Sequence, residues 1–499
     1  MNQEKTNILA PGNLRDKLAG CRLTASAFEP NFRLDAVCDQ VTTCRIIKEN
    51  VRRQVYHLAT PQTGYYLKIA TLVRPKDRWR HFFLPNRKWS EWRNLHRLLK
   101  MGITAAKPVL RGEDSASHPA RFFILTEEVP GFPIKIETGE DAYQLGEFAA
   151  RLHARGIYHP DLHPANLIMT HEGHPRLIDV QQVIFLPWLP HRLRVSNSGK
   201  FYNHLRALKD SAGLSEKFID GYNSAADTGI TMEQLVQAAD RHRQIKFRSR
   251  SKRCCRNTSQ FEIVKDGGWK GYKRKSFHWS LQDLRQALDK GEVLKGAHVI
   301  SFQGVCIKKH LRRPFHKNRC LTSWKMSRAL EVRGIPVPRA LGYFIFDNTS
   351  CFLSEMLESG LHLNEYLSSI SDERTKRRAL KKLALWLRKF YDTHVWQRDF
   401  KSDNILCRKG EYFMLDLDGV KVCRWNPQMK IINLAQLNAS VSNAISLKDR
   451  LRFYHYLTGG AKTSKQRRRA DYRKIWEITR SKTTFYYDLD LDKLCKIGR

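Results

Sequence analysis

The sequence lacks several features that would assign it to a common class of protein. No apolar run approaches the ~18 to 20 residues that a membrane-spanning helix needs, so we expect no such helix. The 11 cysteines include no C-x-x-C pair, which argues against a zinc site and against a disulfide framework. A reduced cytoplasm fits these cysteines best. Residues 1–7 lack the basic-then-apolar order of a secretory signal.

Acidic residues are scarce, because 49 Asp and Glu face 88 Lys and Arg, and the formal net charge is +39. A field of this sign attracts polyanions such as nucleic acid, an anionic membrane leaflet or a phosphorylated glycolipid. Solvated basic faces without a specific ligand are the alternative. No zinc-finger spacing, helix-turn-helix pattern or strand of interleaved aromatic and basic residues is present, so nucleic acid is the least favoured partner.

The chain does contain a short polar motif, in which Asp161 is followed by Asn166 and, at the end of an apolar run, by Asp179. Phosphoryl transfer needs a metal that bridges the phosphates and a carboxylate that orients the attacking hydroxyl. Asp161 is the candidate for orienting the acceptor hydroxyl and taking its proton. Asn166 and Asp179 offer the hard oxygen ligands that suit magnesium. Alternatively, Asp161 could cap the short turn that follows it.

The same motif returns in the second half as Asp399, Asn404 and Asp416, with an offset of 238 residues between the leading carboxylates. A chain of 499 residues exceeds what one hydrophobic core usually supports. The repeat therefore predicts two similar domains, which we place at residues 1–243 and 244–499.

The segments before each motif follow one order. Residues 31–71 contain short alternating apolar runs typical of strands, and residues 88–100 carry apolar residues at helical spacing. The apolar strand 121–127 then runs into a Pro-Gly turn that looks like a hinge between two lobes. A helix that Gly156 terminates leads into the first motif. Because the second half repeats this order, the pattern favours two α+β domains.

Two charged residues and the hinge complete a candidate nucleotide site in the first half. Lys68, on an apolar strand, would reach the phosphates, and Glu91, on the next helix, would pair with Lys68 and hold it in place. Glu127, Glu128 and Val129 lie where backbone groups of a hinge could meet an adenine ring. The alternative for the charged pair is a surface lysine and an exposed helical acid.

Two unusual segments lie between the halves. Residues 241–256 hold eight Lys or Arg and no acid, which predicts either a basic linker or an interaction patch. The Gly-rich stretch Lys265–Tyr272 is either a turn that covers phosphates or a loop that enters the second domain. We favour the loop, because the stretch lies far upstream of Lys308.

The sequence resembles the lipopolysaccharide-core kinases of Gram-negative bacteria, the Kdo and heptose kinases within the protein-kinase-like fold. The resemblance rests on His159-Pro-Asp-Leu-His-Pro-Ala-Asn166 and Leu177-Ile-Asp179, with Lys68 and Glu91 upstream. The Asp-Leu-His-Pro-x-Asn form is also similar to phosphotransferases of the choline and aminoglycoside kind. Gly334-Ile-Pro-Val-Pro338, in the second half, favours the lipopolysaccharide kinases. The resemblance covers nearly the whole chain as two tandem copies.

This resemblance implies that each domain has a small β-rich N-lobe and a larger, mostly helical C-lobe, with ATP and Mg²⁺ between the lobes. It implies a kinase that phosphorylates a Kdo or heptose hydroxyl of the lipopolysaccharide inner core. The enzyme would work at the cytoplasmic face of the inner membrane, and residues 241–256 would be attracted to the anionic leaflet. A kinase of small molecules or proteins, and a copy that only binds nucleotide or glycolipid, are the alternatives.

In the second copy, Asp399 is the candidate catalytic carboxylate, and Asn404 and Asp416 are the candidate metal ligands. Candidates for contact with ATP are Lys308, Glu355 and Lys401. Of these, Lys401 lies two residues after the carboxylate and could touch the transferred phosphate.

The second copy departs from the first at two positions. Gln397 stands where the first copy has His159, and Ser323 stands where the first copy has Glu91. No helical acid is therefore expected opposite Lys308. The first copy is the better candidate for the working site.

Overall fold

The computed structural model of the chain describes residues 8–9, 18, 20–50, 53–73, 89–114, 120–208, 210–296, 298–312, 315–423, 426–443, 445–459, 464–481, 484–488 and 493–497. The segment 1–7, on which the expected lack of a secretory signal rests, lies outside these residues. The chain divides by its contacts into two compact units, Met1–Arg243 and Gln244–Arg499. This division falls inside helix α8, Met232–Ser251. That the two halves are independent domains stays a prediction.

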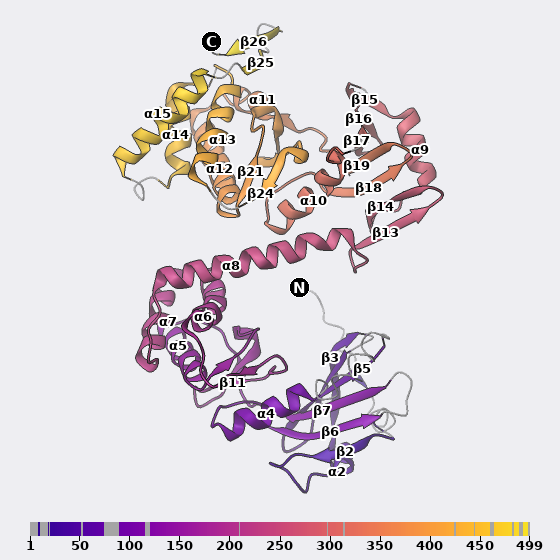
Figure 1. Cartoon of the computed structure of the whole chain (residues 1–499), viewed down its shortest axis with the longest axis vertical. Coiled ribbons are helices and arrows are strands. Elements are labelled where there is room, and N and C mark those ends of the chain that lie inside the picture. The colour runs from indigo at the N-terminus through magenta and orange to yellow at the C-terminus, as the bar shows by residue number, and fades with distance from the viewer. Residues whose placement is uncertain are drawn as a thin grey trace. The chain divides into compact units, whose positions relative to one another are not determined.

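The first unit begins with a seven-stranded antiparallel sheet of order β1-β3-β4-β5-β7-β6-β2 (Figure 1). Its strands are β1 Ile8–Leu9, β2 Arg22–Ala25, β3 Thr43–Asn50, β4 Arg53–Ala59, β5 Gly64–Thr71, β6 Pro108–Asp114 and β7 Arg121–Glu127. Helix α2, Leu34–Gln40, follows β2, and helix α4, Ser90–Lys100, connects β5 to β6 and contacts β6. These strands and the helix α4 agree with the order that the sequence predicts.

The alternation of side chains between the two faces of strand β5 sets the direction in which Lys68 points. Leu67 and Ile69 are buried in the sheet's core, where Leu67 lies opposite Tyr56 of β4 and Leu125 of β7. Successive side chains of a strand point to opposite faces. The side chain of Lys68 therefore projects from the face of the sheet that is opposite this core.

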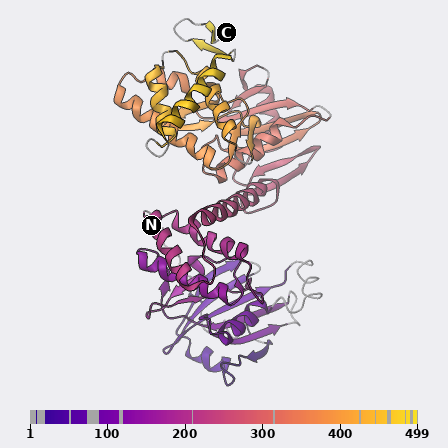
Figure 2. The ribbon, with the colours of Figure 1, turned by 60° about the vertical axis from the view of Figure 1, so that its left-hand side comes forward.

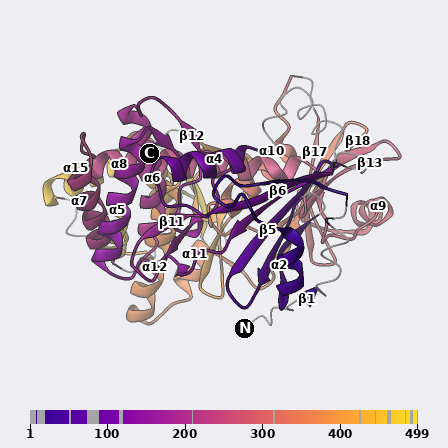
Figure 3. The ribbon, with the colours of Figure 1, turned by 90° about the horizontal axis from the view of Figure 1, so that it is seen from below.

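The second lobe of the first unit is mainly helical, and Figure 3 shows its helices α5, α6 and α7 away from strands β5 and β6. Its helices are α5 Gly139–Ala154, α6 His191–Leu205, α7 Ser211–Ala225 and the first half of α8. Its short strands are β8 Phe132–Pro133, β9 Ile157–Tyr158, β10 Leu167–Met169, β11 Pro175–Leu177 and β12 Ile184–Phe185, with a 3₁₀ turn, Pro164–Asn166.

Helix α5 immediately precedes the first motif. Thr138 caps its N-terminus, because the Thr138 hydroxyl accepts a hydrogen bond from the backbone N–H of Asp141, whose carboxylate accepts one from the backbone N–H of Thr138. After the helix, Gly156 takes a φ of +69°, which glycine adopts without strain. Leu145 and Phe148 bury the apolar face of α5 in the core of this lobe.

The second unit repeats this plan, with a seven-stranded antiparallel sheet of order β13-β14-β18-β19-β17-β16-β15. Figure 2 shows the pink strands of this unit beside its orange and yellow helices. Its strands are β13 Phe261–Asp266, β14 Trp269–Arg274, β15 Glu292–Lys295, β16 Val299–Phe302, β17 Val305–Leu311, β18 Ala340–Phe346 and β19 Thr349–Glu355. Helices α9, Leu281–Lys290, and α10, Arg319–Val332, belong to this lobe.

The helical lobe of the second unit contains α11 Leu363–Ser368, α12 Glu373–Asp392, α13 Pro427–Ser440, α14 Leu447–Leu457 and α15 Lys465–Ser481. Its short strands are β20 Leu361–His362, β21 Val395–Gln397, β22 Ile405–Arg408, β23 Glu411–Met414 and β24 Val420–Val422, with 3₁₀ turns at Ser402–Asn404 and Leu417–Gly419. A hairpin of β25, Thr484–Asp488, and β26, Lys493–Ile497, follows.

The expected loop over Lys265–Tyr272 is wrong, because this stretch forms the β13–β14 hairpin. Gly267 and Gly268 have φ angles of +48° and +85°, which two consecutive glycines supply in a tight hairpin turn. The hairpin lies at the edge of the sheet, and β18 and β19 separate it from β17. It is therefore not a turn beside Lys308.

Residues 241–255 of the basic block, predicted to be a linker or an interaction patch, are helical. They form the second half of α8 and a 3₁₀ turn, Lys252–Cys255. Within the described part of the chain, no helix combines the length and the apolar character needed to cross a bilayer. Every cysteine whose side chain is described is a free thiol.

Candidate functional site

An ion pair of Lys68 and Glu91 connects the sheet of the first unit to helix α4. The Lys68 Nζ donates a hydrogen bond to Glu91 Oε1 and a second one, of 3.1 Å, to the backbone carbonyl of Ile178. Glu91 is only 5% exposed, and Arg53 approaches its other carboxylate oxygen at 3.7 Å. A buried carboxylate needs such partners. The structure thus brings together Lys68, Glu91 and the residue that precedes Asp179.

His159 joins the two parts of the first motif. Its Nε2 donates to the backbone carbonyl of Asp179 at 2.8 Å, and its Nδ1 accepts from the backbone N–H of Asp161 at 3.1 Å. This tautomer suits a neutral ring, and burial lowers the pKa of His159. The side-chain amide of Asn166 donates to the carbonyl of Asp161 at 2.8 Å. Both candidate metal ligands are therefore held to the segment that carries Asp161.

A buried chain of hydrogen bonds connects helices α5, α6 and α7 to the loop that carries Asp161. The Tyr222 hydroxyl donates to His153 Nδ1 at 2.9 Å, and His153 Nε2 donates to Asn197 Oδ1 at 3.1 Å. Asn197 Nδ2 then donates to the carbonyl of His159 at 2.7 Å. Burial lowers the pKa of His153 to about 4 and raises the pKa of Tyr222 to about 12, so both groups are neutral near pH 7.

The Asp161 carboxylate faces solvent, as a base that meets an incoming hydroxyl must. Its side chain is 62% exposed, and His163 Nε2 lies 3.5 Å from Asp161 Oδ1. Asn166 uses its amide nitrogen within the loop, which leaves its oxygen for a cation, and Asp179 is only half-buried. These oxygens fit Mg²⁺, although no three His, Cys, Asp or Glu side chains of the described residues gather as a metal cluster.

The hinge offers fewer backbone donors than the sequence suggested. The N–H of Glu127 donates to Lys107 O at 2.9 Å, and the N–H of Glu128 donates to Gly64 O at 2.8 Å. Both donors are thus used inside the sheet. Their carbonyls and the backbone of Val129 remain the candidates for contact with an adenine ring.

In the second unit, the lysine pairs with a different carboxylate. Lys308 Nζ lies 3.5 Å from Asp416 Oδ1, whereas Ser323, on α10, offers no charge. Burial raises the pKa of Asp416 against the opposing effect of Lys308. Asp416 itself has a φ of +47°, which is uncommon for a residue other than glycine. In this copy, Lys308, the candidate phosphate-binding lysine, is therefore paired with Asp416, the candidate metal ligand.

Gln397 donates to the same carbonyl in the second unit that His159 reaches in the first, although its acceptor binds the N–H of the residue before the leading aspartate. Its Nε2 donates to the carbonyl of Asp416 at 2.9 Å, and its Oε1 accepts from the N–H of Arg398 at 3.0 Å. A side-chain amide has a donor and an acceptor, like a neutral imidazole. Asn404 Nδ2 donates to the carbonyl of Asp399 at 2.8 Å. The geometry of the second loop is thus preserved despite the change.

The other two candidates of the second copy lie apart. Lys401 Nζ lies 3.4 Å from Asp399 Oδ2, beside the candidate catalytic carboxylate. Glu355 ends β19 with an exposed side chain, and its N–H donates to Arg339 O at 2.9 Å. This bond matches that of Glu127, so Glu355 belongs to the second hinge and not to the loop of Asp399.

The lipopolysaccharide kinase (Kdo/WaaP) family matches residues 41–185 and 279–456, which together exceed half of the chain. The chain belongs to this family. Each matched region contains one complete copy of the motif, so the predicted family is confirmed, and with it a phosphotransferase of lipopolysaccharide biosynthesis. No curated protein matches the sequence of this lipopolysaccharide kinase.

Several solved structures resemble the chain. WaaP in complex with acyl carrier protein is 15% identical over 43% of this chain and 92% of its own, with a TM-score of 0.31. An aminoglycoside-3′-phosphotransferase of type VIII is 17% identical over 46% of this chain and 94% of its own, with a TM-score of 0.30. A spectinomycin phosphotransferase with ADP and spectinomycin is 11% identical over 43% and 83%, with a TM-score of 0.30. The family matches a region in each unit, and each unit has a β-rich lobe followed by a mostly helical lobe, so the predicted α+β fold with two tandem protein-kinase-like copies is confirmed.

The buried side chains that hold the loops of this kinase were not found from the sequence. Asn197 and Asn433 each donate to the carbonyl of the residue that joins the two motif parts, at 2.7 and 2.6 Å. Both lie on the helix that follows the motif, 38 residues after His159 and 36 after Gln397. A search for asparagine at nearly equal distance from the two motifs would have found them.

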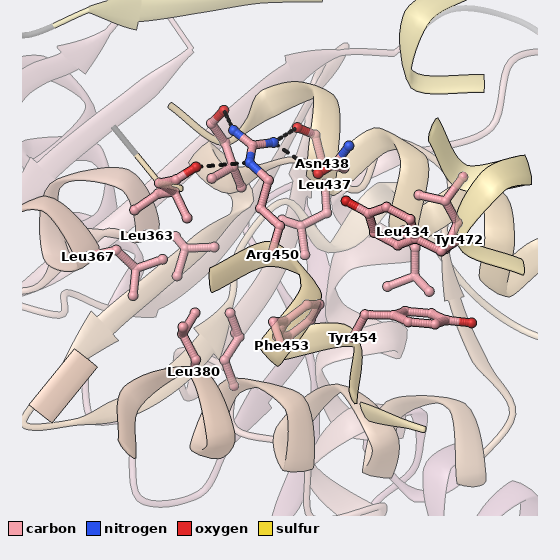
Figure 4. Close-up of a pocket in the computed structure, with 14 residues that line it drawn as sticks. Leu363, Leu367, Leu380, Leu434, Leu437, Asn438, Arg450, Phe453, Tyr454 and Tyr472 are labelled. Atoms are coloured by element: carbon pink, nitrogen blue, oxygen red, sulfur yellow. Dashed lines mark hydrogen bonds between the residues drawn. The ribbon is translucent and has the colours of Figure 1, made fainter. Parts of the chain in front are cut away.

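An apolar pocket in the second unit carries no reacting group. Leucines of α11, α12 and α13, including Leu363, Leu380 and Leu434, line it under Arg450 (Figure 4). The Arg450 guanidinium donates to backbone carbonyls, among them those of Ile445 at 3.0 Å and of residue 438 at 2.7 Å. Arg450 therefore fastens the chain between α13 and α14.

Replacing His153 should make the kinase less sensitive to acid. The unfolded His153 has a pKa near 6.5 and the folded one about 4, so between these values the unfolded state binds more protons and stability falls as pH falls. Once the pH is below both pKa values, this difference has lowered the free energy of unfolding by about 3 kcal/mol. We expect His153→Gln to lose less stability than the wild type between pH 7 and pH 4.5, measured by urea unfolding of the intact chain.

The control for this experiment is His171→Gln, because His171 is exposed in the same unit. This control should follow the wild type at each pH. If the His153 variant loses as much stability as the wild type over this interval, the neutral buried ring is not the cause of acid sensitivity.

Proposed function

We propose that the chain transfers the γ-phosphoryl group of ATP to a Kdo or heptose hydroxyl of the lipopolysaccharide inner core, and that its first unit is the working site. Family membership supports the kinase activity and the lipopolysaccharide context. The observation that carries the choice of unit is the ion pair of Lys68 and Glu91, which leaves Asp179 available to a cation.

In this proposal, the exposed Asp161 carboxylate orients the acceptor hydroxyl and accepts its proton. Lys68 binds phosphate oxygens, and Glu91 holds Lys68 in the required direction. The oxygens of Asn166 and Asp179 would hold Mg²⁺, which neutralises charge on the phosphates when it is bound. The carbonyls at the hinge would receive the adenine.

The second unit is proposed to have lower activity or none. Its Asp416 would have to leave Lys308 before it could bind a metal, since the two groups now pair at 3.5 Å. Its Asp399, Lys401 and Asn404 nevertheless keep the arrangement of a phosphate-transfer loop. A copy that binds nucleotide or glycolipid without turnover is therefore the second candidate function for this unit.

The test compares Asp161→Ala with Asp399→Ala in the intact chain, given labelled ATP, magnesium and lipid-A-core acceptors. Loss of a general base lowers the rate by about 100-fold or more. We expect this loss for Asp161→Ala and nearly full transfer for Asp399→Ala. Transfer lost only with Asp399→Ala would assign the second unit as the working site. Labelling of amino alcohols in place of the glycolipid would contradict the proposed acceptor.

We further propose that the enzyme contacts the anionic inner-membrane leaflet through a groove between α14 and α15. The groove combines cations with apolar side chains that are exposed despite their size: Leu447 is 55% exposed, Leu451 44% and Trp476 42%. The basic residues of its lining are His455, Lys465, Arg468, Arg469 and Arg473.

Charge and amphipathic character together favour a bilayer as the occupant of this α14–α15 groove. Lys and Arg are attracted to anionic headgroups by about 1 kcal/mol each, and tryptophan is enriched at the boundary between headgroups and acyl chains. Leucines on the same surface can enter that boundary. A glycolipid acceptor anchored in the same leaflet would then be presented to a kinase that is already held there.

This surface is tested by binding to vesicles with and without anionic phospholipid. Arg469→Glu with Arg473→Glu should lower binding to anionic vesicles at least about tenfold, because two attractions are reversed. The matched control, Arg248→Glu with Arg250→Glu, makes the same charge change on the exposed part of the basic block 241–256. Equal losses in both double variants would contradict the groove, and loss only in the control would assign the contact to the basic block.

A further inference from the structure

The two motif loops place a cation beside the leading carboxylate in different ways. In the second unit the cation belongs to the loop itself, because Lys401 follows Asp399 by two residues and lies 3.4 Å from its carboxylate. In the first unit, His163 occupies the equivalent position, two residues after Asp161. The first loop thus lacks the lysine that the second loop supplies.

The helices that follow the two motifs can be aligned residue by residue. Asn197 of α6 donates to the carbonyl of His159, and Asn433 of α13 donates to the carbonyl of Gln397. His159 and Gln397 are themselves equivalent, since each bonds the carbonyl of the second motif aspartate. The two asparagines therefore fix one common register for α6 and α13.

Three residues beyond these asparagines, the two helices differ in charge. There α6 has Lys200, whose Nζ donates to the carbonyl of Pro160, immediately before Asp161. At the same position α13 has Gln436, whose Nε2 donates to the equivalent carbonyl, of Arg398, at 2.8 Å. Both side chains thus reach the same point of the loop, but only Lys200 brings a positive charge there.

The surroundings of Lys200 favour an anionic partner. It is partly buried, and its Nζ lies 5.8 Å from the centre of the Tyr158 ring. Burial lowers the pKa of Lys200, while the nearby Asp161 carboxylate acts in the opposite direction. An ammonium has three N–H donors, of which the described hydrogen bond to Pro160 uses one.

We propose that Lys200 takes in the first unit the role that the loop lysine Lys401 is suited to in the second: it binds the phosphoryl group that is being transferred. In the first unit the cation is on helix α6, and His163 stands at the loop position that Lys401 has in the second unit. This inference rests on the proposed function of the first unit.

The charge of Lys200 matters most during transfer itself. The acceptor oxygen forms a bond to the γ-phosphorus, the bond from that phosphorus to the bridging oxygen of ADP breaks, and Asp161 receives the hydroxyl proton. Negative charge is spread over the equatorial oxygens of the phosphoryl group in this transition state. Lys200 keeps its proton and stabilises that charge, as a fixed donor in a partly buried site can.

A purely structural role for Lys200, the support of the Pro160 carbonyl, is the competing explanation. Gln436 shows that glutamine can reach this carbonyl from the same helix position. The variant Lys200→Gln therefore keeps the support and removes the charge. A second change, His163→Lys, returns a charge from the position that Lys401 occupies in the other unit.

The experiment measures kcat and KM for ATP, and the thermal unfolding midpoint, in the intact chain with Asp399→Ala as background. We expect Lys200→Gln to lower kcat about 100-fold with little change of the midpoint, the usual cost of removing one donor to a transition-state charge. The double variant Lys200→Gln, His163→Lys should recover at least about tenfold of that loss. Lys200→Arg, which keeps the charge, should stay within about tenfold of the wild type.

Each contrary outcome has a definite meaning. Wild-type kcat in Lys200→Gln, or no recovery in the folded double variant, would overturn the proposal for Lys200. If Lys200→Gln lowers the unfolding midpoint markedly, Lys200→Arg decides the question, and a low kcat in that variant would overturn the proposal. Full activity of Asp161→Ala would overturn the proposed function itself, whereas an inactive Asp161→Ala with an active Lys200→Gln overturns only this inference.

Discussion

The candidate site depends on one hydrogen bond, which joins the two parts of the motif in each unit. In the first unit His159 donates to the carbonyl of Asp179, and in the second Gln397 donates to that of Asp416. Each bond links the strand before the catalytic carboxylate to the segment that carries the candidate metal ligand. Because His159 and Gln397 are buried, loss of either bond would leave an unpaired polar group, which costs about 1–3 kcal/mol.

Much of this arrangement could be predicted from the sequence, because strands and helices have characteristic periods. The period of two on β5 placed Lys68 on a strand, and the helical spacing after it placed Glu91 on a helix, so their pairing could be expected. The equivalence of His159 and Gln397 could not, since a ring and an amide look unrelated until their donors and acceptors are placed in space. The β13–β14 hairpin was missed because glycines mark loops and tight turns alike.

The two units share one fold, but the lysine of the sheet pairs with a different carboxylate in each. In the first, a helical acid holds the lysine of the sheet, and the aspartate of the second motif part remains open to a cation. In the second, that helical acid is absent, and Lys308 turns to Asp416 instead. The absence of the acid was visible in the sequence, but the new partner was not, because 108 residues separate the two groups in the chain.

If the first unit is the working site, it receives ATP with the phosphates beside Lys68. An acyl-phosphate derivative of ATP acylates lysines next to the bound phosphates, and mass spectrometry of peptides from the intact chain locates the label. We predict strong labelling of Lys68 that excess ATP with magnesium prevents, and weaker labelling of Lys308, because its partner Asp416 is the candidate metal ligand of that unit. Protected labelling confined to Lys308 would contradict the assignment of the first unit.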